Sequence, residues 1–167
     1  YSTSKRPWNW KFCSWKKMLK FSKEIIDQYS DKLIVPIDAI VTDKKLQKNP
    51  KSKLINEIEK NDMIVDIGPQ TRMLFFNEIL KAKIVLWNGP LGFFENKPFN
   101  EGTEYVLQAI KGNKNKNFFS VAGGGDTISL LNQSNCFEDF SFVSTGGGAF
   151  LEFIRGANMP GLTSLNY

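Results

Sequence analysis

The second half of the chain alternates between short apolar runs and segments in which apolar residues recur every three or four positions. Runs of β-branched and aromatic residues are typical of buried strands, whereas the wider spacing is typical of helices with one buried face. The pattern predicts strands at 63–68, 83–87, 117–122 and 140–145, and helices at 70–82, 100–112, 123–133 and 146–158. Asn100 is placed to serve as the N-cap residue of the helix that follows it.

The first 60 residues are less regular. A helix is predicted at 15–29, where apolar residues gather on one face. A β-branched run predicts a buried strand at 33–41, although Pro36 interrupts it. After a lysine-rich connection, residues 53–60 fit either a short strand or a helical turn.

A strand, a glycine turn and a helix, repeated at short intervals, are typical of a parallel sheet wrapped by helices. The sequence therefore predicts an α/β fold. Right-handed crossovers place every strand-to-helix turn at one edge of such a sheet, where ligands bind. The turns that begin at Gly68, Asn88, Gly123 and Gly146 are expected to meet at that edge.

Composition narrows the class of protein. The chain has 167 residues, of which 41% are hydrophobic and 23% charged, as in a soluble globular domain. No apolar run approaches the roughly 20 residues of a membrane span, and the start has no apolar signal-peptide core. Two cysteines, Cys13 and Cys136, predict reduced thiols and a cytoplasmic location instead of a disulfide framework.

Charge and residue types limit the chemistry. The net charge is +5, which suggests nucleic acid as a partner, but the lysines are spread along the chain and favour a solvated surface. The chain contains no histidine. Any catalysis must therefore rely on carboxylates, lysines, backbone amides or a hard metal ion.

The stretch "SVAGGGDTISLL" (120–131) places three glycines between a strand and a helix. Glycine lets a ligand approach the main chain, and a helix N-terminus attracts phosphate. Gly124 and Gly125 thus suit a phosphate, and Thr127 can cap the helix or donate to a phosphate oxygen. Asp126 fits there if magnesium lies between the carboxylate and the phosphates. The alternative is a tight turn with Asp126 as a simple N-cap.

Two further loops strengthen the phosphate interpretation. "STGGGAFLEF" (144–153) again leads from a strand through three glycines into a helix, and two such turns at one edge suit a polyphosphate. The loop 88–99 combines glycine and proline with Phe93, Phe94 and Glu95. Its aromatic surfaces suit a flat base, and its carboxylate suits the hydroxyls of a ribose. Core packing of the two phenylalanines is the alternative.

Four blocks of the chain together resemble one family. "DIGPQT", "VLWNGPLGFFENKPFNEGT", "VAGGGDTISLL" and "FSFVSTGGGAFLEF" follow the order and spacing of the C-terminal, nucleotide-binding domain of phosphoglycerate kinase. The resemblance implies a three-layer αβα, Rossmann-like parallel sheet. It also implies a glycolytic enzyme that transfers a phosphoryl group between 1,3-bisphosphoglycerate and ADP, with ATP/ADP and Mg²⁺ as cofactors.

The resemblance also implies roles for residues of loop 88–99. Glu95 matches the ribose-binding carboxylate of the family. Asn88, Pro90 and Phe93 match positions that line the site for adenosine and phosphates.

Residues in the two glycine turns match the phosphate end of the family's site. The amides that face the transferred phosphoryl group are expected to be those of Gly124, Gly125, Gly147 and Gly148. Asp126 matches the magnesium carboxylate, and Thr127 matches the residue at the helix start beside the phosphates.

The chain departs from the family by lacking the N-terminal lobe, which binds phosphoglycerate. Residues 1–19 are expected to be a divergent or unstructured lead-in, and 20–167 a partial nucleotide-binding domain. Three hypotheses follow: part of an active kinase, an inactive nucleotide-binding remnant, or a basic module that binds nucleic acid. The expected partners are the nucleotide, phosphoglycerate and a missing lobe supplied by another chain, without nucleic acid or membrane.

Overall fold

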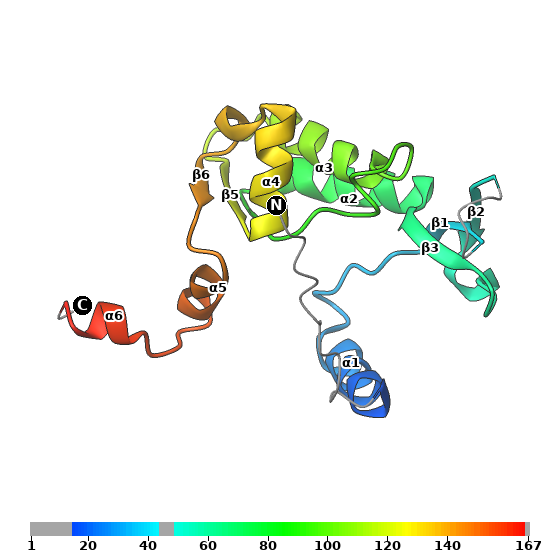
Figure 1. Cartoon of the computed structure of the whole chain (residues 1–167), viewed down its shortest axis with the longest axis horizontal. Coiled ribbons are helices and arrows are strands. Elements are labelled where there is room, and N and C mark those ends of the chain that lie inside the picture. Colours follow the sequence, from blue (N-terminus) through cyan, green and yellow to red (C-terminus); the bar gives the residue numbers. More distant parts are fainter. Residues whose placement is uncertain (1–14, 44–48, 166–167) are drawn as a thin grey trace, which may run out of the picture. The chain divides into compact units, whose positions relative to one another are not determined.

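The computed structural model of the chain describes residues 15–43 and 49–165 (Figure 1). Most of the predicted lead-in, with Cys13, and part of the lysine-rich connection lie outside the described residues. The chain divides into two compact units, residues 1–35 and 36–167.

The first unit contains one described helix, α1 (Trp15–Tyr29), at the predicted position. Apolar side chains such as Phe21 and Ile26 are exposed on it. The strand predicted at 33–41 is correct only in its second half, because β1 begins at Asp38 and residues 33–37 are exposed. An apolar run predicts burial only if neighbouring strands cover it, and Pro36 lacks an N–H for a sheet ladder.

Three strands at the start of the second unit form an antiparallel sheet in the order β2-β1-β3. They are β1 (Asp38–Thr42), β2 (Lys51–Leu54) and β3 (Met63–Ile67), and the turn η1 (Ile55–Glu57) follows β2. Segment 53–60 thus contains both structures that its pattern allowed. The sheet has a register irregularity between Ile40 and Val41.

Membership of β3 in this antiparallel sheet corrects one prediction. Gly68, which follows β3, donates its N–H to the carbonyl of Asp38 (3.0 Å) and does not lie at the edge of the parallel sheet. The prediction for Gly68 was wrong because a strand that precedes a helix has the same apolar pattern whether its neighbours are parallel or antiparallel.

A second sheet, parallel throughout, has the order β4-β5-β6. Its strands are β4 (Ile84–Trp87), β5 (Phe119–Gly123) and β6 (Phe142–Ser144). The helices that accompany the two sheets are α2 (Pro69–Lys81), α3 (Glu101–Gly112), α4 (Gly125–Ser134), α5 (Gly148–Ile154) and α6 (Pro160–Thr163), with the turn η2 (Phe137–Asp139) before β6 (Figure 1). Helix α5 is shorter than predicted, since Gly156 adopts a φ of +72° just after it.

The hydrophobic core lies on one face of the parallel sheet. Trp87 and Ala122 from the strands pack with residues of α3 and α4, such as Ile110 and Leu131. Trp87 also stacks on Phe140, with ring centroids 5.9 Å apart. This face anchors the strands whose ends carry the predicted site.

The opposite face of the parallel sheet is largely exposed. Because side chains alternate between faces along a strand, Leu86 and its register neighbours Val121 and Phe142 point away from the core. Ile84 and Phe142 are 72% and 52% exposed. Phe150 of α5 lies near Gly123 at one end of this face. None of the described helices is long and apolar enough to cross a membrane.

Candidate functional site

Three loops begin where neighbouring parallel strands end. Trp87 of β4 pairs with Ala122 of β5, and Gly123 of β5 pairs with Ser144 of β6. Loop 88–99 and both triple-glycine turns therefore start side by side at one edge of the sheet. Three of the four predicted turns thus share that edge.

A small cavity of about 210 Å³ joins two of these segments. It is lined by Gly92, Phe93, Phe94, Glu95, Asn96 and Asp126. The carboxylates of Glu95 and Asp126, predicted to bind a ribose and a metal ion, therefore lie at the same cavity. The structure brings together an aromatic residue and two carboxylates from separate loops.

Both carboxylates are available to a ligand. Glu95 and Asp126 are exposed, and within the described part of the chain neither makes a hydrogen bond or an ion pair. Asp126 lies in the first turn of α4, but the N-cap residue of that helix is Gly124, and no side chain caps it. The simple N-cap interpretation of Asp126 was therefore wrong.

One position of the first triple-glycine turn needs glycine because of its backbone conformation. Gly124 has a φ of +93°, and a Cβ atom there would lie 2.5 Å from Oδ1 of Asn88. An L side chain would be strained and would displace Asn88. At Gly125, by contrast, a Cβ atom would meet no atom within 4 Å. The backbone of Gly125 thus faces open space at the start of α4.

Thr127 holds the turn against the neighbouring loop. Its side chain is fully buried, and its hydroxyl accepts the N–H of Gly89 (2.8 Å). This contact joins loop 88–99 to α4 and accounts for a buried threonine at this position. Its predicted role beside phosphates stays a prediction.

Phe93 also lines the cavity, whereas several other predicted residues do not. Phe93 is 41% exposed, whereas Phe94 also packs against the core, so the two phenylalanines have different environments. The other predicted residues do not line the cavity formed by the described residues around Asp126; they are Asn88, Pro90, Gly124, Gly125, Thr127, Gly147 and Gly148. Gly147 and Gly148 begin the helical turn that follows β6.

Two buried aspartates were not identified from the sequence. Asp38 of β1 accepts the N–H groups of Gln70 (3.0 Å) and Thr71 (2.8 Å) at the start of α2. Asp66 of β3 accepts the N–H of Gly102 (2.8 Å) at the start of α3. Each strand therefore supplies the cap of a helix. The signal for them was an aspartate within or beside each β-branched run.

The predicted position of Asn100 is confirmed, but its side chain does not cap the helix. Asn100 is the N-cap residue of α3 by position, but its amide donates to Glu104 (2.6 Å) and does not cap the helix. The cap comes from Asp66. Burial raises the pKa of the Asp66 carboxyl above its ordinary value, although Gly102 and the charge of Arg72 act in the opposite direction.

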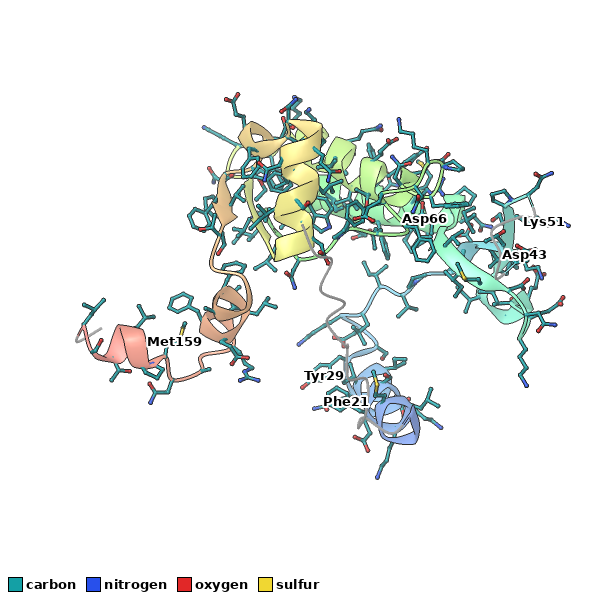
Figure 2. The ribbon with its side chains drawn as sticks, viewed as in Figure 1. Phe21, Tyr29, Asp43, Lys51, Asp66 and Met159 are labelled. Carbon is teal, nitrogen blue, oxygen red and sulfur yellow. The ribbon has the colours of Figure 1, made fainter. Side chains whose placement is uncertain are left out.

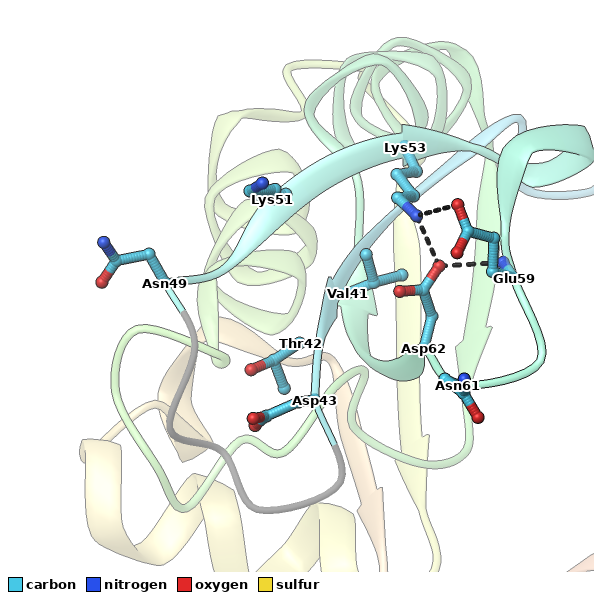
Figure 3. Close-up of a pocket in the computed structure, with 9 residues that line it drawn as sticks. All are labelled: Val41, Thr42, Asp43, Asn49, Lys51, Lys53, Glu59, Asn61 and Asp62. Atoms are coloured by element: carbon cyan, nitrogen blue, oxygen red, sulfur yellow. Dashed lines mark hydrogen bonds and ion pairs between the residues drawn. The ribbon is translucent and has the colours of Figure 1, made fainter.

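A larger cavity of about 320 Å³ lies at the antiparallel sheet (Figure 3). Lys53 donates there to Asp62 (2.7 Å) and Glu59 (3.4 Å), so its charge is already neutralised. The cavity also lies on the antiparallel sheet, away from the ends of the parallel strands. It is a weaker candidate for phosphate binding than the edge of the parallel sheet.

The residues at the smaller cavity fit one type of metal ion. No cluster of three or more acidic, histidine or cysteine ligands occurs within residues 15–43 and 49–165. A dedicated protein cage for a transition metal is therefore absent from that part. A single carboxylate, as at Asp126, fits Mg²⁺, which takes one or two carboxylates together with phosphate oxygens and water.

Comparison with known proteins identifies the family. The family model described as phosphoglycerate kinase matches residues 10–157. The chain is 41% identical over 150 residues to a phosphoglycerate kinase of Buchnera aphidicola, which covers 89% of this chain and 38% of the relative. A phosphoglycerate kinase of Dictyoglomus turgidum is 40% identical over 151 residues, with 88% and 38% covered.

Solved structures agree with these matches. Phosphoglycerate kinase from Coxiella burnetii superposes with a TM-score of 0.77 at 34% identity, covering 84% of this chain and 37% of the other. The enzyme from Pyrococcus horikoshii gives 0.73 at 32% identity, with 90% and 37% covered. The α/β, Rossmann-like fold class is thereby confirmed. The chain spans about 38% of the length of these curated relatives and belongs to the phosphoglycerate kinase family.

Proposed function

We propose that this chain is the nucleotide-binding part of a phosphoglycerate kinase and binds ADP or ATP with Mg²⁺ at the carboxyl edge of the parallel sheet. The observation that carries the proposal is the shared cavity of Phe93, Glu95 and Asp126. The reaction proposed for the complete enzyme moves the phosphoryl group of 1,3-bisphosphoglycerate to ADP, giving ATP and 3-phosphoglycerate.

Loop 88–99 would bind the nucleoside. The exposed ring of Phe93 offers a surface for the base, with Pro90 and Asn88 nearby in the same loop. Glu95, which has no partner within the described part of the chain, would accept hydrogen bonds from the ribose hydroxyls. Binding of the base needs an aromatic face, and binding of the ribose needs a free carboxylate. Loop 88–99 carries both.

The glycine turns would bind the phosphates. The unobstructed backbone at Gly125, with the positive-φ turn at Gly124, suits close approach of phosphate oxygens to N–H groups at the start of α4. Gly147 and Gly148 would contribute a second set of amides. Thr127 would lie beside the phosphates. Asp126 would hold Mg²⁺, which neutralises phosphate charge when bound.

This chemistry is consistent with a chain that has no histidine. Phosphoryl transfer depends mainly on positioning and on neutralisation of charge, and it needs little proton transfer. The transferred group leaves a carboxylate, so no general acid has to protonate the leaving group.

Calorimetric titration with MgADP tests the binding site. Wild-type protein is expected to release or absorb heat with saturable, 1:1 binding, and Glu95→Gln is expected to weaken binding tenfold or more. Glu138→Gln, at an exposed carboxylate of η2, is the matched control and should bind as the wild type does. The proposal fails if the wild type does not bind MgADP or if both variants bind equally well.

We further propose that turnover requires the part of the relatives that this chain does not span. The exposed apolar face of the parallel sheet, which includes Ile84, Leu86, Phe119 and Phe142, supports this proposal. Monomeric proteins rarely leave contiguous apolar faces of this kind uncovered. The cover would come from the part of the relatives that this chain does not span.

A coupled assay of ATP formation from 1,3-bisphosphoglycerate distinguishes this proposal from an inactive remnant. The chain alone is expected to be inactive, and addition of the unmatched part of the Buchnera relative is expected to restore activity. Ile84→Lys should prevent this rescue while MgADP binding is retained. Rescue of the Ile84→Lys variant to the wild-type level would exclude this face as the docking surface.

A further inference from the structure

Asp66 lies where three segments of the second unit meet. It belongs to β3, and Figure 2 labels it near the end of that strand. Its side chain is fully buried. Oδ2 accepts the N–H of Gly102 (2.8 Å), and Oδ1 accepts the N–H of Ile67 (2.8 Å). The carboxylate is therefore fixed at both oxygens.

The same carboxylate supports the nucleotide loop. A Cβ atom at Gly92 would lie 2.7 Å from Oδ1 of Asp66, so the backbone of Gly92 packs directly on the carboxylate. The next residue, Phe93, donates its N–H to the carbonyl of Val65 (2.9 Å). Asp66 and Val65, adjacent in β3, thus contact Gly92 and Phe93, which are adjacent in the loop and line the small cavity.

Arg72 of α2 completes the arrangement. Its guanidinium donates to the carbonyl of Ile67 (3.0 Å), to Oδ2 of Asp66 (3.1 Å) and to Glu101. Arg72 is 6% exposed, so the pair with Asp66 is buried and each charge depends on the other. The pair joins β3 and α2 to the first turn of α3.

We infer that Asp66, held by Arg72, is a positioning residue for the nucleotide: it fixes loop 92–95 so that Phe93 and Glu95 face the ligand. The inference deepens the proposed function and rests on it for the identity of the ligand. The antiparallel sheet is then the support of the nucleoside end of the site. Asp66 itself contacts no ligand.

Asp38 provides a matched control for a purely structural role. It is also fully buried in the antiparallel sheet and also caps a helix, α2. Its side chain accepts hydrogen bonds from Gln70 and Thr71 and lies against Gly68, and no hydrogen bond in the described part of the chain joins it to loop 88–99. Asp38→Asn and Asp66→Asn should both destabilise the fold, but only Asp66→Asn should alter the loop.

The experiment combines hydrogen exchange with MgADP titration of the full chain. Exchange of the Phe93 amide is measured relative to the core amide of Leu131, which corrects for global unfolding. Asp66→Asn is expected to raise this ratio tenfold or more and to weaken MgADP binding tenfold or more. Asp38→Asn should leave both at wild-type values.

The outcomes separate the two proposals. Failure of the wild type to bind MgADP would refute the proposed function, while the exchange ratio would still test the support of the loop. A wild-type exchange ratio in Asp66→Asn, or an equal rise in Asp38→Asn, would overturn the inference. If Asp66→Asn does not fold, Arg72→Lys replaces it, with the same expected direction, because lysine cannot reach all three acceptors at once.

Discussion

Alanine at Gly124 should destabilise the fold, whereas alanine at Gly125, its direct neighbour, should not. At Gly124 φ is +93° and ψ is 143°, a region that costs an L residue about 1–3 kcal/mol, and the new Cβ atom would lie 2.5 Å from Oδ1 of Asn88. At Gly125, the first residue of α4, a Cβ atom would meet open space, so alanine fits there without strain. The two variants should therefore differ by about 1–3 kcal/mol in the free energy of unfolding.

Urea unfolding and thermal melts of the two variants measure this difference. For a chain of this size, about 1–3 kcal/mol corresponds to a separation in melting temperature of roughly 2–12 °C. Gly125→Ala should melt at or above the wild-type temperature and Gly124→Ala clearly below it. Equal stability of the two variants would refute the conformation that we assign to this turn.

Two further predictions concern buried polar groups. Thr127→Val removes the acceptor for the N–H of Gly89 and should lower the free energy of unfolding by about 1–3 kcal/mol in urea; a change below about 0.5 kcal/mol would contradict the role of this contact. Burial alone would raise the pKa of Asp38, but hydrogen bonds from Thr71 and Gln70 outweigh it and lower the pKa. Ionised Asp38 therefore stabilises the fold above about pH 4 and loses this effect as the pH falls through its lowered pKa. Asp38→Asn should be less stable than wild type in urea at pH 7, with a smaller difference at pH 3; a constant difference would be inconsistent with the lowered pKa.

The elements of the second half of the chain could be predicted because their apolar patterns are regular. Strand, turn and helix follow one another from residue 63 onward, and the structure contains each predicted element there within a few residues at most ends. The pattern could not show that β3 joins an antiparallel sheet. Pairing depends on contacts far apart in sequence, and the alternation of apolar residues carries no information about strand direction.

The sequence indicated the residue types of the candidate site but not the residues that support it. A glycine turn followed by Asp126 predicts phosphate and metal binding from neighbouring residues alone. The aromatic loop with Glu95 predicts nucleoside binding in the same way. The roles of Asp66 and Arg72 arise only from burial and from long-range contacts, such as the bond between Asp66 and Gly102. A single charged residue in a strand does not reveal which helix it will cap.

The most direct test of the nucleotide site is the magnesium dependence of ADP binding in wild type and in Asp126→Asn, measured by calorimetry with MgCl₂ or with EDTA. The account predicts that wild type binds ADP at least tenfold more tightly with magnesium, and that Asp126→Asn loses this difference while it still binds ADP. The same magnesium effect in both proteins would show that Asp126 does not hold the ion.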